Sequence, residues 1–69
     1  MKRHTDLVDR ATFAYARWCR RTGHIFEQPA AGASTVHHAG GCVRIELRNG
    51  YRLLACYGWN GIRLSRKHL

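Results

Sequence analysis

Acidic residues are few in this 69-residue sequence, in which four Asp and Glu stand against twelve Lys and Arg. The formal net charge is therefore +8, and the basic residues comprise ten Arg and only two Lys. Few carboxylates remain for general acid–base catalysis, whereas Arg carries a planar fork that matches phosphate and carboxylate groups. This composition argues against an enzyme and favours a protein that binds a polyanion, with nucleic acid as the leading candidate.

Apolar segments are short throughout, and none approaches the roughly 18 residues that a membrane-spanning helix requires. The basic residues near the N-terminus are not followed by the apolar stretch of a secretory signal. We therefore expect a cytoplasmic protein that does not associate with membranes.

Cysteine occurs three times, and an odd number is unusual for a small secreted domain held by disulfides. Reduced, partly buried thiols are the expected state. The side chains of zinc-binding type are Cys19, Cys42, Cys56, His24, His37 and His38. They contain no CxxC pair, so we predict neither a metal site nor another cofactor, and zinc binding is the weaker alternative.

A nucleophile–base pair would have to combine Cys42 or Cys56 with His37 or His38, and the sequence offers nothing to orient such a pair. Glu46 lies among Arg residues, which indicates a structural ion pair rather than a catalytic carboxylate. No catalytic residue is therefore predicted.

The whole chain, residues 1–69, is expected to form one small domain. A chain of this length buries only about 60% of the surface that its unfolded state exposes, so its core is thin. A hydrophobic content of 45% nevertheless predicts a folded protein rather than a disordered tail. Since a thin core gains from extra support, a homodimer is an alternative to the monomer.

Residues 6–22 have the pattern of an amphipathic helix. At about 100° per residue, its apolar side chains share one broad face: Leu7, Val8, Ala11, Ala14, Tyr15, Trp18 and Cys19. Thr5 is the expected N-cap, and Gly23 suits the position just past the last turn.

The clearest strand pattern is CVRIELR, residues 42–48, in which apolar and polar side chains alternate. The dipeptide Asn49-Gly50 predicts a hairpin turn, after which YRLLACYGW returns. A second Asn-Gly pair, at 60–61, precedes a third strand candidate, IRLS. Two short segments before residue 42, HIFEQ and STVHH, are further strand candidates. The predicted fold is α+β, with an N-terminal amphipathic helix packed on a small three- to four-stranded antiparallel β-meander.

The register of the hairpin can be predicted from its turn. A two-residue turn at 49–50 pairs Ile45 with Leu54, and the helix then packs on Val43, Ile45, Leu47 and Leu54. In this register Tyr57 and Trp59 lie on the opposite face, beside Arg44. A bulge at Gly58 would exchange the two faces.

Two Arg-rich surfaces are candidates for binding nucleic acid or an acidic protein surface. The first is on the helix and contains Arg10, Arg17, Arg20 and Arg21, which would contact phosphates while Phe13 stacks on a base. Arg10, Arg17 and Arg21 form a stripe beside the apolar face. The second is on the sheet and contains Arg44, Arg48, Arg52, Arg63, Tyr51, Tyr57 and Trp59. Aromatic rings interleaved with Arg on a sheet are typical of single-strand binders. The competing interpretation is a solvated helix face and aromatic rings that belong to the core.

The C-terminal segment with Arg63, Arg66, Lys67 and His68 is a third candidate, either a polyanion-docking tail or a frayed, solubilising end.

The stretch RIELRNGYRLLACYGWNGIRL, residues 44–64, resembles the strand–turn–strand region of small phage-borne anti-CRISPR proteins, which share RIE, two residues and NG before an apolar strand. The resemblance implies an alternative function, an inhibitor that binds a nucleic-acid-handling protein. A protein-interaction module of this kind is expected to expose Tyr57, Trp59 and Ile62 within a rim of Arg.

Overall fold

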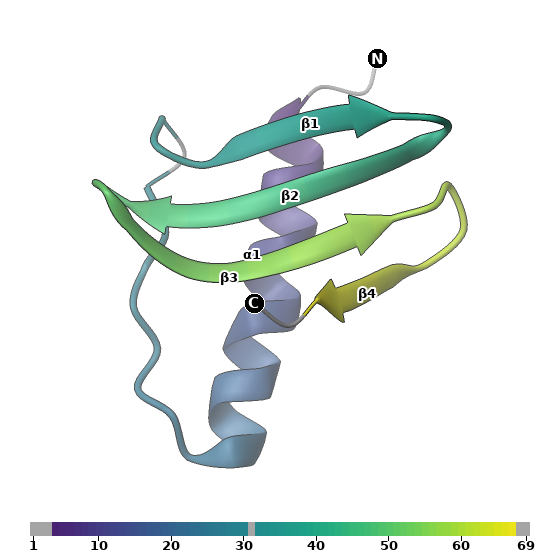
Figure 1. Ribbon diagram of the computed structural model, residues 1–69. Helices are drawn as coiled ribbons and strands as arrows, with labels where there is room; N and C mark the ends of the chain where they lie inside the picture. The colour runs from purple at the N-terminus through teal and green to yellow at the C-terminus, as the bar shows by residue number, and fades with distance from the viewer. Residues whose placement is uncertain (1–3, 31, 68–69) are drawn as a thin grey trace.

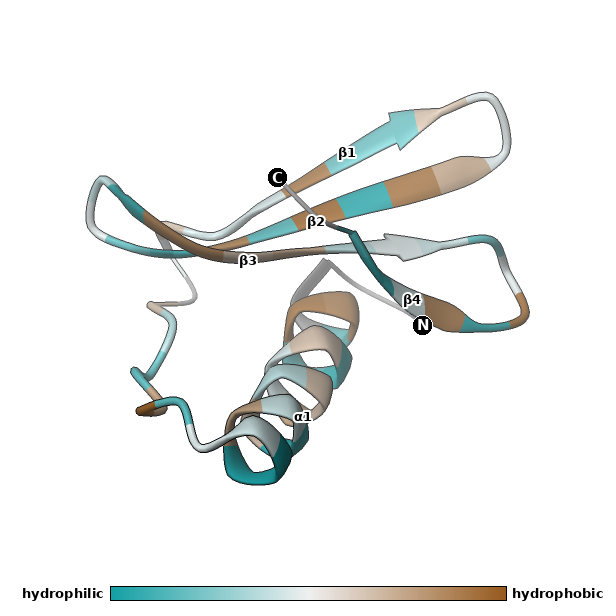
Figure 2. Cartoon of the chain, turned by 60° about the horizontal axis from the view of Figure 1, so that its bottom comes forward, coloured by the Kyte–Doolittle hydropathy of each residue, from teal (hydrophilic) through white to brown (hydrophobic). Residues whose placement is uncertain are grey.

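The computed structural model describes residues 4–30 and 32–67 and contains one helix and four strands. The elements are α1 (His4–Thr22), β1 (Thr35–Ala39), β2 (Cys42–Asn49), β3 (Arg52–Trp59) and β4 (Leu64–Lys67). The strands form one antiparallel sheet in the order β1-β2-β3-β4. The helix lies across one face of this sheet, as Figures 1 and 2 show. The predicted α+β fold is confirmed, with four strands in the meander.

The C-terminal end of α1 has the predicted structure. Gly23 has a φ of 79°, in the left-handed region that favours glycine, and the His24 N–H donates to the Cys19 carbonyl oxygen at 3.0 Å. This hydrogen bond closes a Schellman motif. The helix begins at His4, so the prediction of Thr5 as its N-cap is wrong.

The core lies between the apolar face of α1 and the sheet face turned toward it, which we call the inner face. Its buried members are Val8, Ala11, Tyr15, Cys19, Ile45, Leu47, Ala55 and Tyr57. Ala11 is fully buried, and its small side chain suits the close approach of helix and sheet. The predicted packing of the helix on β2 is therefore confirmed.

The predicted register between β2 and β3 is wrong by two residues beside the turn and by three residues farther along the strands. Ile45 pairs with Tyr57 rather than with Leu54, and Asn49 pairs with Arg52 across the two loop residues Gly50 and Tyr51. Among the described residues only glycines have positive φ, and Gly50 has 64°. A type I′ turn at 49–50 requires positive φ at both positions, whereas glycine at the first loop position suits a type II′ turn.

The two-residue shift beside the turn keeps the predicted faces, but from Ala55 onward the shift is three residues, and this odd shift exchanges the two faces of β3. Tyr57 and Trp59 lie on the inner face, and Cys56 and Gly58 lie on the outer one. The register also changes between Leu47, which pairs with Ala55, and the next residue, which pairs with Leu53. Leu54 is the extra residue of this bulge, so the bulge predicted at Gly58 is wrong.

Two other strand predictions have different outcomes. STVHH corresponds to β1, but the segment 24–28 forms no strand and connects α1 toward β1 as an irregular chain (Figure 1). The last strand begins at Leu64 rather than at Ile62, because the side-chain oxygen Oδ1 of Asn60 accepts the N–H groups of Ile62 and Arg63, each at 2.8 Å. Among the described residues, no helix has the length and apolar character required to cross a membrane.

Candidate nucleic-acid interface

The predicted stripe of arginines on α1 is exposed and faces the edge strand β4. The guanidinium carbon of Arg10 lies 5.2 Å from the ring centre of Trp59, which is the last residue of β3. Arg17 and Arg21 line a small cavity together with Arg66 of β4. The stripe therefore forms one side of a basic surface, and Arg66 of the edge strand β4 forms the other side.

Arg66 is held in place by an aromatic ring of the helix. Its guanidinium carbon lies 3.8 Å from the ring centre of Trp18. A cation over an indole face at this distance contributes about 0.5–2 kcal/mol, the larger values applying when water is excluded. We call the surface formed by Arg10, Arg17, Arg21 and Arg66 the helix–β4 face.

The cavity beneath this face has a volume of about 160 Å³ and is lined by Ala14, Arg17, Trp18, Arg21, Tyr57 and Arg66. Tyr57 is only 3% exposed, and its hydroxyl group has no hydrogen-bond partner. The Nε and Nη1 atoms of Arg66 are also buried without a partner. A buried donor without an acceptor costs about 1–3 kcal/mol, so a ligand that supplies acceptors to these groups would be stabilised at the cavity.

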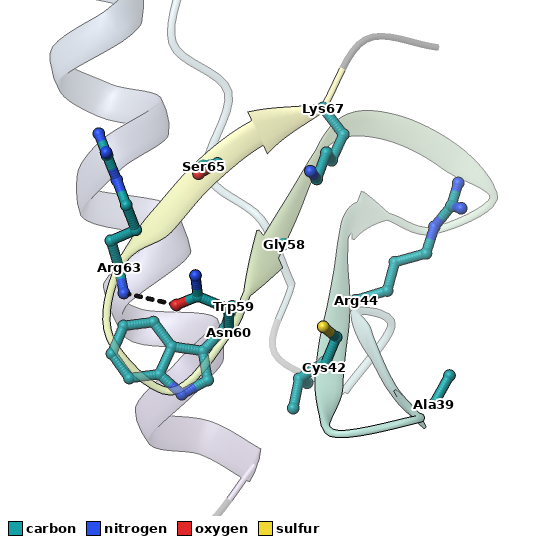
Figure 3. Close-up of a pocket in the computed structure, with 10 residues that line it drawn as sticks. Ala39, Cys42, Arg44, Gly58, Trp59, Asn60, Arg63, Ser65 and Lys67 are labelled. Atoms are coloured by element: carbon teal, nitrogen blue, oxygen red, sulfur yellow. Dashed lines mark hydrogen bonds between the residues drawn. The ribbon is translucent and has the colours of Figure 1, made fainter.

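The outer face of the sheet carries a larger groove, of about 410 Å³ (Figure 3). Arg44, Arg63 and Lys67 supply its positive charge. Lys67 lies over Gly58, where a Cβ atom would stand 2.6 Å from the Lys67 Cε. Gly58 thus leaves room for the Lys67 side chain along the floor of the groove.

Glu46 neutralises much of the charge on this outer face. Its carboxylate lies 3.0 Å from Nη2 of Arg48 and 3.4 Å from Nε of Arg44, and it accepts a hydrogen bond from the Thr35 hydroxyl at 3.2 Å. The hydrogen bond from Arg48 is the main reason that the pKa of Glu46 is lowered, with Thr35 and the nearby charge of His37 acting in the same direction. The predicted structural ion pair is confirmed, and Arg44 and Arg48 are not free cations.

The other predicted binding residues are distributed over the molecule. Arg52 pairs with Glu27 at 3.3 Å. Arg20 is exposed on α1, and Arg63 is exposed at the rim of the outer groove. Tyr57 belongs to the core and Trp59 is half-buried under Arg10, so the predicted platform of aromatic rings and Arg on one sheet face does not form.

Arg66 is the member of the site that the sequence did not single out, since it was assigned to a basic tail. In the structure it lies in β4 and pairs with Tyr57, which directs both side chains to the inner face. The correct register of β3 and β4 would have predicted that Arg66 lies on the inner face beside Tyr57. His68, the last basic residue of that tail, lies outside the described residues.

The cysteines and histidines do not gather at one place. Within the described ranges, no three His, Cys, Asp or Glu side chains come together in a way that could hold a metal ion. Cys19, Cys42 and Cys56 are free thiols. His24 instead packs on Trp18, with ring centres 4.3 Å apart, and its Nδ1 lies 2.7 Å from the Thr22 hydroxyl.

Comparison of the chain with protein families, with curated proteins and with solved structures finds no match. The function must therefore be argued from the chemistry of the surface.

Proposed function

We propose that this protein binds nucleic acid through the helix–β4 face, without catalysis, in the cytoplasm. One observation carries the proposal: within the described part of the chain, Arg10, Arg17, Arg21 and Arg66 have no ion-pair partner and converge on one face. Nucleic acid is the polyanion that a cell offers in greatest amount to such a surface.

The spacing of the stripe suits a phosphate backbone. At about 1.5 Å per residue, Arg10 and Arg21 are separated by about 16 Å along the helix axis. One strand of a B-form duplex carries a phosphate every 3.4 Å or so along the duplex axis, so a helix lying parallel to that axis spans about five phosphate positions.

The aromatic residues favour backbone contacts over base recognition. The rings of Trp18 and Trp59 are each covered on one side by a guanidinium group, and Tyr57 is buried. Phosphate contacts carry no sequence information, so we expect binding with little sequence preference.

The test is binding to labelled single-stranded and double-stranded DNA and RNA over a series of salt concentrations. The variant R10A/R17A/R21A removes the stripe, and R44A/R48A/R52A removes an equal charge from residues paired with Glu46 or Glu27. We expect the first variant to lower the slope of log K against log salt by about 2–3 on duplex DNA, and the second to change it little.

Equal effects of the two triple variants would mean that net charge alone attracts nucleic acid, and would overturn the assignment of this face. Binding no tighter than that of an unrelated protein of charge +8 would overturn the function itself. Thermal melting of both variants provides the check that they fold.

A protein-interaction or inhibitor function is the second candidate that the sequence suggested. The patch predicted for it does not form, because Tyr57 is only 3% exposed while Ile62 is 84% exposed. An acidic protein partner for the helix–β4 face becomes the better explanation if nucleic acid fails to bind. Sedimentation analysis would test the homodimer separately.

A further inference from the structure

We infer that the cavity beneath the helix–β4 face is a binding pocket for one phosphate group. Every ionisable side chain that lines it, except the Tyr57 phenol, is an arginine: Arg17, Arg21 and Arg66. The inference rests on the proposed function in one respect, namely that the phosphate belongs to a nucleic acid.

The buried groups around the cavity are hydrogen-bond donors without acceptors. The Tyr57 hydroxyl and the Nε and Nη1 atoms of Arg66 have no partner within the structure. A phosphate group offers several acceptor oxygens and a negative charge, and Arg recognises it with two parallel N–H donors. An oxyanion would therefore supply the hydrogen-bond acceptors that these three groups lack within the protein.

The arginines on the two sides of the cavity differ in how firmly their side chains are held. The guanidinium carbon of Arg66 lies 3.8 Å from the ring centre of Trp18, whereas Arg17 and Arg21 reach the cavity from exposed positions on α1. The atoms Nε and Nη1 of Arg66 are buried, so an anion gains access to them when the side chains at this rim rearrange.

The cavity is open to solvent on one side, so its volume limits only the group that it encloses. Pockets for drug-sized molecules have about 300–1,000 Å³, and one water occupies about 30 Å³ of the liquid. The 160 Å³ of this cavity can enclose a tetrahedral oxyanion with a few waters, and the rest of a nucleotide would extend into solvent. The phosphate is either a diester of the backbone or a terminal monoester.

The experiment is a titration with inorganic phosphate at constant ionic strength, with chloride as the balancing anion, followed by NMR of the Arg66 Nε–H group. The variants are Y57F, which removes only the hydroxyl, and R20A, which removes an exposed helix charge outside the cavity. We expect saturable binding by the parent, about tenfold weaker binding by Y57F, and a change within about twofold for R20A. Thermal melting verifies that both variants fold.

The same variants are then measured against one oligonucleotide with and without a 5′-phosphate. Tighter binding of the phosphorylated form that disappears in Y57F assigns the pocket to a terminal monoester. Equal binding of both forms, with both weakened in Y57F, assigns it to the backbone diester.

The two proposals fail in different ways. If phosphate does not bind saturably and Y57F holds oligonucleotides as the parent does, the pocket is overturned while the nucleic-acid function stands. If phosphate binds through Tyr57 but no oligonucleotide binds, the pocket stands and the proposed function is overturned.

Discussion

The guanidinium group of Arg66 lies over the indole ring of Trp18, 3.8 Å from its centre, and thereby joins the last strand to the helix. Both residues are partly buried, and both line the small cavity under the helix–β4 face. This contact makes the position of the edge strand depend on the helix, and it brings a cation of the sheet next to the cations of α1.

Replacement of Trp18 by Leu is expected to lower the free energy of unfolding by about 1–2 kcal/mol. The variant loses part of a packed ring and the cation–π contact with Arg66. Chemical denaturation measures the effect, and Phe13→Leu on the same helix is the control, because Phe13 is 73% exposed. Equal losses in the two variants would show that Trp18 contributes no more than an exposed aromatic residue.

Replacement of Tyr57 by Phe is expected to raise the free energy of unfolding by about 1 kcal/mol in phosphate-free buffer, because it removes a buried hydroxyl group without a partner. The same change is expected to weaken phosphate binding, so stability and function should move in opposite directions. Tyr51→Phe is the control, since Tyr51 is fully exposed. A destabilised Y57F protein would indicate that the hydroxyl has a partner in solution.

Stability is expected to fall in acid because of Glu46. Its pKa is lowered by the hydrogen bond from Arg48, so the unfolded chain binds a proton at higher pH than the folded protein does. The stabilising contribution is complete above the ordinary value of 4.5 and is lost as the pH falls through the lowered pKa. The measurement is urea denaturation between pH 7 and acid conditions.

The variant E46Q should be less stable than the parent near neutral pH, and the difference should shrink as Glu46 becomes protonated in the parent. A constant difference across the pH range would contradict the role of the carboxylate charge.

Replacement of Gly50 by Ala is expected to lower the free energy of unfolding by about 1–2 kcal/mol, because a φ of 64° brings a Cβ atom into conflict with the backbone. Gly32→Ala is the control, since Gly32 has no positive φ and a Cβ there meets nothing within 4 Å. If the two variants melt at the same temperature, the turn does not depend on the conformation at Gly50.

Local patterns accounted for much of this fold. The 3.6-residue period of α1, the glycine at position 23 and the alternation in β2 each depend on neighbours in the chain, and each prediction from them holds. The arginine stripe was predictable for the same reason. Once the apolar face of a helix is identified, its 3.6-residue period also gives the positions that border this face.

The register of β3 depended on interactions between distant residues. Asn49-Gly50 is compatible with two-residue loops at 49–50 and at 50–51, which differ in register by two residues and place the same face of β3 on the helix. The bulge at Leu54 exchanges the faces, and packing of Tyr57 and Ala55 against α1 favours this bulged arrangement. For the same reason, the aromatic platform predicted on the sheet does not exist.

Composition and short-range order thus established a basic α+β protein with an arginine-lined helix, because charge and periodicity can be counted along the chain. Tertiary packing decided which arginines carry free charge. Glu27 pairs with Arg52 across the fold, and the pairing of β3 with β4 turns Arg66 inward onto Trp18. These contacts join residues far apart in sequence, whereas Glu46 pairs with Arg44 and Arg48 on its own strand. The geometry of the long-range contacts follows from how the helix and sheet bury their apolar faces together.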